Sequence, residues 1–180
     1  MRLISLARRY AGALFEAAKD ANIIDKVESD LGMMTYSLNA VPRLSEALSH
    51  PLIPSTKKKE IAREIFEGNV DGITLDFLCL LIDKRREEVL VDIETEYIQI
   101  ADSWRGIVKA VVTSVVALTD DEQSRLQSKI AAQTGKMVEL EMHQDPSLIG
   151  GVIVKIGDTI IDGSIKSYLA ALRDQLLGKE

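Results

Sequence analysis

The chain has 180 residues, of which 46% are hydrophobic and 28% are charged, an ordinary composition for a globular protein. Its net charge of -6 argues against a nucleic-acid-binding protein, because such proteins concentrate Lys and Arg on one surface. A single cysteine cannot form an internal disulfide, which fits a reducing compartment. No apolar run approaches the roughly 20 residues that span a bilayer. We therefore expect no direct membrane insertion, and any membrane association should arise through partners.

The first fifteen residues are basic and contain no acidic side chain. This composition is similar to that of a transit peptide. The helical periodicity, however, continues past Glu16 without a break. We therefore favour an ordinary helix from Leu3 to Ala21 with a basic first turn.

Further helices are predicted as far as Trp104. A single apolar stripe marks the second helix, Pro42 can open the third, and Ser55 or Thr56 can cap the fourth. Short connections between the helices favour a compact antiparallel bundle. The predicted bounds are Ile24 to Leu38, a short helix from Pro42, Ser55 to Phe66, Ile73 to Lys84, and Glu87 to Trp104.

The composition changes after Gly106, where β-branched residues favour strands. Thr119 and Glu122 have the spacing of a capping box, which predicts a helix start. The predicted elements are a strand over Ile107 to Val116, a helix from Thr119 to Gly135, a strand over Met137 to Met142, a hairpin of Val152 to Ile156 with Thr159 to Ile161, and a helix over Ile165 to Leu177 capped by Ser164. The fold class is therefore α+β: an N-terminal six-helix bundle in residues 1–105, followed by a small C-terminal α/β domain in residues 106–180 with a short sheet and a terminal helix.

No group of residues has the spacing of a catalytic or cofactor site. His50 and His143 have no ligand-spaced companions, and Cys79 lies in an apolar helical run, where a buried inert thiol is expected. Gly150-Gly151 precedes a strand and is not a dinucleotide-binding motif. The basic runs 57–59 and 84–86 are balanced by neighbouring acids and are interpreted as solvated helix faces or ends. We expect no catalytic residue, no metal and no cofactor.

Two of the predicted helices are more apolar than one side of a core requires. The apolar arc of the first helix is roughly 200° wide, and the fifth is apolar almost all round, apart from Asp76 and Asp83. A groove left open for an amphipathic partner helix would explain both faces. Alternatively, the fifth helix is simply central and the alanines of the first permit close packing. The last helix has an ordinary stripe that we expect to pack on the sheet: Ile165, Tyr168, Leu169, Leu172 and Leu176.

The segment from Leu148 to Asp158, followed by Ile160 to Ser164, is similar to the signature of the delta-subunit family of F-type ATP synthases, whose mitochondrial member is the oligomycin-sensitivity-conferral protein. Residues 7–15 and 77–86 also resemble the family's first and fifth helices. In the signature, glycines permit bends that side chains would obstruct, and Asp-Gly pairs favour turns. These residues are interpreted as structural: Gly150, Gly151, Gly157, Asp158, Asp162 and Gly163.

The resemblance implies a non-catalytic stator subunit that links the catalytic head of the ATP synthase to its peripheral stalk. The N-terminal domain is expected to bind N-terminal helices of the alpha subunits, and the C-terminal domain the b subunits. One copy per complex is implied, at the cytoplasmic side of a bacterial cell membrane, in a synthase that translocates protons or sodium ions. The implied alpha-binding residues are Tyr10, Ala11, Leu14, Phe15, Phe77, Leu78, Leu81 and Ile82.

Two other interpretations compete with the stator subunit. One is a different helix-groove scaffold with an appended α/β domain, and the other is an enzyme with an unrecognised site between its domains. The turn of residues 84–87 departs from the family pattern, because it lacks the Asn or Gly that is common there. This departure concerns the geometry of the turn and leaves the assignment unchanged.

Overall fold

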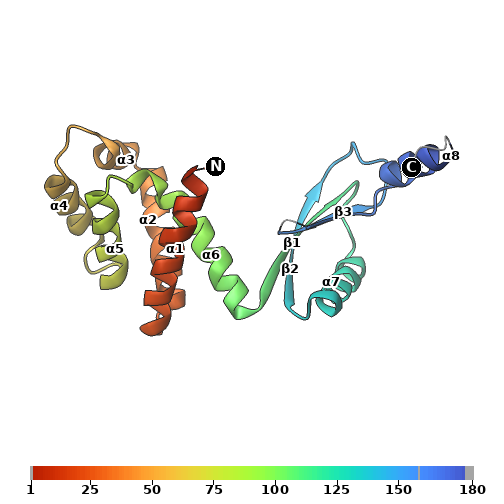
Figure 1. Ribbon diagram of the computed structural model, residues 1–180, viewed down its shortest axis with the longest axis horizontal. Coiled ribbons are helices and arrows are strands. Elements are labelled where there is room, and N and C mark those ends of the chain that lie inside the picture. The colour runs from red at the N-terminus through yellow and green to blue at the C-terminus, as the bar shows by residue number, and fades with distance from the viewer. Residues whose placement is uncertain (1, 158, 177–180) are drawn as a thin grey trace. The chain divides into compact units, whose positions relative to one another are not determined.

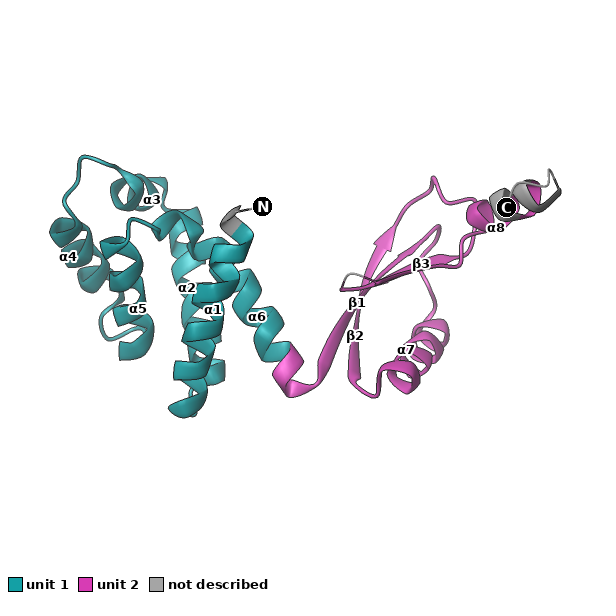
Figure 2. Ribbon diagram, viewed as in Figure 1, with its two compact units in different colours: residues 1–102 teal, residues 103–180 magenta. Residues whose placement is uncertain are grey.

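The computed structural model describes residues 2–157 and 159–176, without the side chains of residues 2, 3, 170, 171 and 174–176 (Figure 1). The chain divides into two compact units, residues 1–102 and 103–180 (Figure 2). The division lies in the last turn of a helix, a few residues before Gly106.

The first unit consists of helices that pack against one another around a common core (Figure 1). Its elements are α1 (Arg2–Asp20), α2 (Ile24–Ala40), α3 (Pro42–Ser49), α4 (Ser55–Phe66), α5 (Gly72–Asp83), the 3-10 turn η1 (Glu87–Val89) and α6 (Leu90–Arg105). These bounds confirm the helices predicted from the sequence, with two local corrections. Pro54 occupies the N-cap of α4, so neither Ser55 nor Thr56 caps it. The sixth helix is preceded by a separate 3-10 turn.

Aromatic side chains and small residues together fill the core of this unit. Tyr97 is fully buried, its ring meets Phe15 edge-on at 6.0 Å, and its hydroxyl donates a 3.1 Å hydrogen bond to the carbonyl of Ile24. A buried Tyr hydroxyl needs such an acceptor. Alanines from three helices let the backbones approach closely: Ala7, Ala11, Ala18, Ala62 and Ala101 are all buried. The contacts therefore join α1, α2 and α6 into one packed body.

The turn after α5 explains how the chain manages without the expected Asn or Gly. The Arg86 N–H donates to the Leu81 carbonyl and the Arg85 N–H to the Ile82 carbonyl, at 2.9 and 3.1 Å. This is the Schellman pattern, which needs a left-handed residue after the helix. Arg85 takes that conformation, with φ of 53°. The turn is thus formed with a residue that is less suited to it than glycine.

The second unit is a four-stranded mixed sheet with two helices, which confirms the α+β class. Its elements are β1 (Ile107–Ser114), α7 (Asp120–Thr134), β2 (Met137–Gln144), β3 (Val152–Ile156), β4 (Thr159–Asp162) and α8 (Ile165–Leu176). The strand order is β2-β1-β3-β4. Strands β1 and β2 are parallel, with Ile107 opposite Met137, and the other two pairs are antiparallel. The parallel pair is connected through α7, as parallel strands require.

Local sequence signals determine the ends of several elements in this unit. The predicted capping box of α7 is present, with the Thr119 hydroxyl accepting from the Glu122 N–H and the Glu122 carboxylate accepting from the Thr119 N–H. Gly135 ends α7 in the left-handed conformation. Ser164 caps α8 by accepting from the Ser167 N–H. The core beneath α7 is small, and its buried members are Ala110, Val112, Ile130, Val138 and Val154.

The last helix differs from the sequence prediction. The apolar stripe of α8 was expected to pack on the sheet, but its described members are exposed, and Tyr168 has 70% of its surface accessible. Leu176 lies outside the described side chains. Strand β4 is exposed along its whole length, including Ile160 and Ile161. The described apolar residues of this end of the unit are Ile160, Ile161, Ile165, Tyr168, Leu169 and Leu172, and we call them the terminal apolar surface.

Candidate partner-binding surfaces

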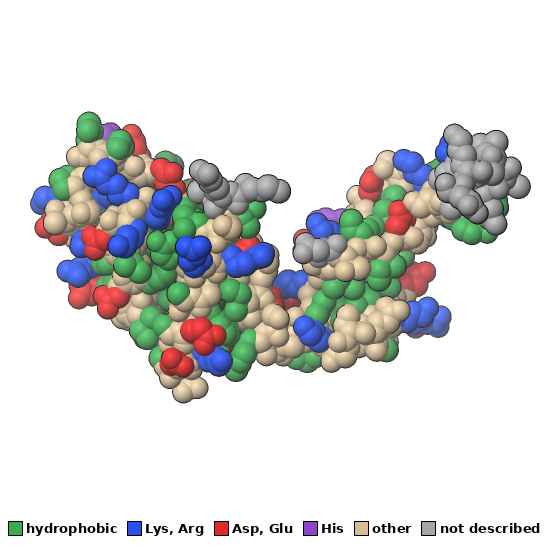
Figure 3. Space-filling model, viewed as in Figure 1, with side chains coloured by type: hydrophobic (Ala, Val, Ile, Leu, Met, Phe, Trp, Pro, Cys, Tyr) green, Lys and Arg blue, Asp and Glu red, His purple; other side chains and the backbone are tan. Residues whose placement is uncertain are grey.

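An open groove with a volume of about 520 Å³ lies between α1 and α5. Hydrophobic side chains gather on this face of the first unit, with charged side chains around them (Figure 3). The groove is mostly apolar, as expected of a site that buries part of a partner. Its lining residues are Leu6, Arg9, Tyr10, Ala13, Leu14 and Ala17 from α1, and Ile73, Asp76, Phe77 and Leu80 from α5.

Helical spacing brings each set of lining residues onto one face. The α1 residues follow intervals of three and four, and so do those of α5, which places each set on a single stripe. The two stripes meet where the Tyr10 ring contacts Phe77 edge-on, with ring centres 6.2 Å apart. Ala13 and Ala17 are exposed and short, so they leave room that larger side chains would fill. The result is a groove with an aromatic contact in its floor.

A buried carboxylate fixes the position of α5, and hence of one groove wall. Asp30 on α2 is fully buried. Its Oδ2 atom accepts from the Asp71 N–H at 2.7 Å and from the Thr74 hydroxyl at 3.2 Å, while its Oδ1 atom lies 2.8 Å from the Lys26 ammonium. Asp71 in turn caps α5 by accepting from the Ile73 N–H. Since buried charges need such partners, this network holds the start of α5 against α2.

The residues that the resemblance implied for alpha binding fall into two groups in the structure, one that lines the groove and one that lies in the core. Tyr10, Leu14 and Phe77 line the groove. The other members of the set point into the core of the first unit, and Ala11 has 0% of its surface exposed. These core residues are Ala11, Phe15, Leu78, Leu81 and Ile82. Helical wheels identified the two helices, but they could not separate the face that packs inward from the face that remains open.

Several groove residues were not singled out from the sequence. The apolar arcs of the two helices include these residues, but an arc alone does not show which of its members face the groove. The groove residues in question are Leu6, Ala13, Ala17, Ile73 and Leu80. Leu80 is the clearest case, because it is exposed on a helix whose other side is buried.

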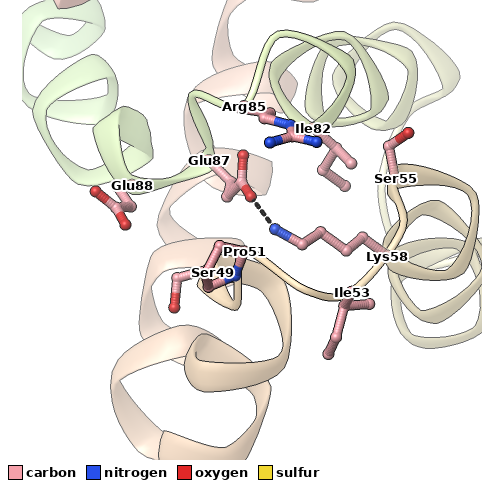
Figure 4. Close-up of a pocket in the computed structure, with 9 residues that line it drawn as sticks. All are labelled: Ser49, Pro51, Ile53, Ser55, Lys58, Ile82, Arg85, Glu87 and Glu88. Carbon is pink, nitrogen blue, oxygen red and sulfur yellow. Dashed lines mark hydrogen bonds and ion pairs between the residues drawn. The ribbon is translucent and has the colours of Figure 1, made fainter.

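The basic run at residues 57–59 is not uniformly solvated, which corrects the sequence prediction. Lys58 is 5% exposed and forms an ion pair with Glu87, also buried, beside a cavity of about 180 Å³ (Figure 4). Lys57 and Lys59 pair with Glu60 and Asp83 at the surface. Burial of Lys58 costs solvation free energy that only a close counter-ion can offset. The Lys58–Glu87 pair therefore ties α4 to η1, while the Lys59–Asp83 pair joins α4 to the end of α5.

The glycines of the signature lie where two backbone segments touch. A Cβ atom on Gly151, whose φ is 83°, would lie 2.2 Å from the Gly163 carbonyl oxygen. One on Gly150 would lie 2.6 Å from the Ile165 side chain. Backbone hydrogen bonds of 2.9 Å join Gly163 to Val152 and Ile165 to Gly150. The glycines thus allow the chain before β3 to contact the start of α8.

Two other signature residues, Gly157 and Asp162, lie where strands end. Gly157 follows β3 with φ of 56°, and Asp158 lies outside the described residues. The Asp162 carboxylate accepts hydrogen bonds from the Ser167 hydroxyl at 2.6 Å and from the Ser164 N–H at 2.8 Å. These bonds, first of all that from Ser167, lower the pKa of Asp162 below its ordinary value. The charged form of Asp162 therefore supports the first turn of α8.

The described residues offer neither a metal site nor a helix that could span a membrane. No group of three or more His, Cys, Asp or Glu side chains among them could hold a metal ion. None of the described helices is long and apolar enough to cross a membrane. Cys79 is buried in α5, as predicted.

Comparison with known proteins assigns the family. The family model described as ATP synthase delta (OSCP) subunit matches residues 6–176. The chain belongs to this family. Among curated members of the delta family, ATP synthase subunit delta of Desulforudis audaxviator is 40% identical over 172 residues, covering 96% of this chain and 94% of its own length. The corresponding subunit of Chlorobaculum tepidum is 40% identical over 173 residues, with 96% of each chain covered.

The fold agrees with this membership. A chain in a mitochondrial ATP synthase hexamer of Toxoplasma gondii superposes with a TM-score of 0.67 at 20% sequence identity, covering 96% of this chain and 97% of that one. At this identity the similarity concerns the fold alone. As a member of the delta (OSCP) family, the protein is a non-catalytic structural subunit of the F-type ATP synthase and a component of its stator.

Proposed function

We propose that the groove between α1 and α5 binds the N-terminal helix of an alpha subunit, and that the second unit binds the b subunits of the peripheral stalk. The observation that carries the first part is the open apolar groove, lined by Leu6, Tyr10, Ala13, Ile73 and Leu80. An amphipathic helix is the simplest occupant, because its single apolar stripe would fill the groove while its polar side stays in water. In this proposal each of the two compact units binds one partner, the first unit the alpha subunit and the second unit the b subunits.

The terminal apolar surface supports the second part of the proposal. Its described residues are exposed on β4 and α8, and exposed apolar surface of this kind commonly marks a protein interface. The stripe on α8 has the helical spacing that would suit a partner helix, such as one from a b subunit.

A subunit bound to both partners would prevent the catalytic head from turning with the rotor. Rotation would then be coupled to the translocation of protons or sodium ions elsewhere in the synthase. The proposal includes one copy per complex, held at the cytoplasmic side of the bacterial cell membrane by its partners.

Titration of an alpha N-terminal peptide tests the groove. We expect apolar burial to drive binding, at roughly 25 cal/mol per Å² before ordering costs are subtracted. Ala13→Asp places a charge in the groove from an exposed position, so it should reduce affinity at least about tenfold without unfolding α1. Moderate salt should change the affinity only slightly, because apolar contacts are not screened.

Ala40→Asp is the matched control, since Ala40 is also exposed but lies at the end of α2, away from the groove. Circular dichroism verifies that both variants stay folded. Equal affinities of the peptide for the two variants would place its binding site elsewhere.

The second surface is tested with C-terminal fragments of the b subunits. Tyr168→Ser combined with Leu172→Ser removes apolar groups from the exposed stripe of α8, and we expect b binding to weaken while the alpha peptide still binds normally. Lys166→Ser is the control on the same helix. If the double variant keeps full affinity for the b fragments, the stalk contacts another part of the second unit.

A further inference from the structure

One charged residue lies on each side of the groove, and the two charges have opposite sign; we call the outer edges of the groove, on α1 and on α5, its lips. Arg9 lies on α1 and Asp76 on α5, and both are exposed. Each precedes a member of the ring pair Tyr10–Phe77 by one residue, so the two charges lie at nearly the same level of the groove. No ion pair or hydrogen bond links either side chain to another described side chain. Both charges are thus available to an occupant.

Helix geometry places these charges at the outer edges of the apolar stripes. At 100° per residue, Arg9 lies roughly 140° around α1 from Leu14, and Asp76 roughly 100° around α5 from Phe77. Leu14 and Phe77 are buried on the core side of the groove. The two charges therefore lie where the polar flanks of a bound amphipathic helix would pass.

A helix seated in an apolar groove can run in either of two directions. Turning it end for end keeps its apolar stripe in the groove but exchanges its two flanks between the lips. Lips of equal charge would not distinguish the two directions. Lips of opposite charge distinguish the two directions, provided that the helix carries an acidic residue on one flank and a basic residue on the other.

We propose that Arg9 and Asp76 select the direction of the bound helix, by accepting an acidic flank beside α1 and a basic flank beside α5. This inference rests on the proposed function, because it concerns the same groove. The occupant is an amphipathic helix of the catalytic head with that charge pattern. Direction matters for a stator, since it decides at which end of the groove the rest of the partner chain leaves.

The size of the effect follows from the exposure of the two charges. Exposed ion pairs contribute little individually, so the favoured direction should exceed the reversed one by about tenfold in affinity when two attractive pairs replace two repulsive ones. The apolar stripe is the same in both directions. The preference should therefore decline with added salt, while most of the affinity remains.

Three synthetic helical peptides with one common apolar stripe provide the test. The first has Glu on the flank that faces Arg9 when the peptide runs parallel to α1, with Lys on the other flank; the second has Glu and Lys exchanged; the third has Gln at both places. A spin label at the peptide N-terminus broadens amide signals of the full-length protein at whichever end of the groove it occupies, Leu6 or Ala17.

We expect the first peptide to broaden the signal of Leu6, the second that of Ala17, and the Gln peptide both. In the charge-exchanged variant Arg9→Asp with Asp76→Arg, the first two results should reverse. If the two charged peptides bind in the same direction, or if their directions do not change in the variant, Arg9 and Asp76 do not select the direction. The proposal that the groove binds a helix would still stand. If none of the three peptides binds, the groove proposal itself fails, and this inference fails with it.

Discussion

The two units of the chain bury their apolar side chains very differently. The first packs aromatic, aliphatic and small residues from α1 to α6 into one extensive core and leaves an open groove between α1 and α5. The second has a small core beneath α7 and exposes the described apolar residues of β4 and α8. A protein unit that buries more apolar surface is more stable on its own. The first unit therefore offers a preformed site, whereas the second should gain stability from its partner.

The largest effect should come from a charge in the core of the first unit. Ala11→Asp buries a carboxylate without a partner, which costs several kcal/mol, comparable with the whole stability of a small domain. Hydrogen exchange should show the loss of protection across α1 to α6 and normal protection in β1 to β3. Ala13→Asp, two residues away on the exposed side, is the control. A fully protected first unit in Ala11→Asp would contradict the burial of Ala11.

Breaking the buried ion pair should destabilise the same unit somewhat less. Lys58→Met leaves the Glu87 carboxylate buried without its counter-ion, and such a loss costs about 3–5 kcal/mol. Denaturant unfolding measures it. The double variant Lys58→Met with Glu87→Leu should recover much of the loss, because no isolated charge remains. Lys57→Met, which removes only an exposed pair, should change the free energy of unfolding by less than about 1 kcal/mol.

A glycine substitution distinguishes the second unit from the first. Gly151→Ala forces a Cβ atom against the Gly163 carbonyl at a positive φ, so we expect a loss of at least about 2 kcal/mol confined to the second unit. Gly12→Ala in α1 meets no neighbour within 4 Å and should stabilise the first unit by about 0.5–1 kcal/mol. Thermal unfolding followed by NMR resolves the two units. Equal effects of the two substitutions would contradict the close contact at Gly151.

The smallest effect concerns the pH dependence of α8. Hydrogen bonds lower the pKa of Asp162 in the folded chain. The charged carboxylate therefore contributes its full stabilisation at pH values above the pKa of Asp162 in the unfolded chain, and this stabilisation is lost as the pH falls through the pKa in the folded chain. Asp162→Asn should thus be less stable than the wild type at neutral pH, and the difference should shrink under acid conditions. Chemical denaturation at several pH values measures it. A constant difference from neutral to acid pH would mean that the charge contributes nothing.

The sequence predicted the elements well because their signals are local. The capping residue Thr119 and the left-handed Gly135 determine where α7 begins and ends through contacts with their near neighbours in sequence. The parallel pairing of β1 with β2 is a long-range contact and had no local signal. The open position of α8 was missed for a related reason. An apolar stripe indicates that a surface will be buried, but it does not say whether by the same chain or by another.

The candidate site was predicted only as a pair of helices. Ala11 and Ala13 are identical in type and close in sequence, yet the first is in the core and the second in the groove. Their difference arises from how α1 is rotated against its neighbours, and the ring contact of Phe15 with Tyr97 on α6 helps to set that rotation. Lys58 illustrates the same limit. Its burial depends on Glu87, 29 positions along the chain, and not on its basic neighbours.

The connection between α6 and the sheet has a mechanical consequence. The chain passes from α6 through Gly106 directly into β1, a strand that is hydrogen-bonded on both sides. By register, the start of β1 and the end of β4, which leads into α8, lie at opposite ends of the sheet. A tensile force between α6 and α8 would therefore act along the strands and load their hydrogen bonds in shear. Bonds loaded together in this way resist rupture better than bonds that open one after another, which suits a component of a stator.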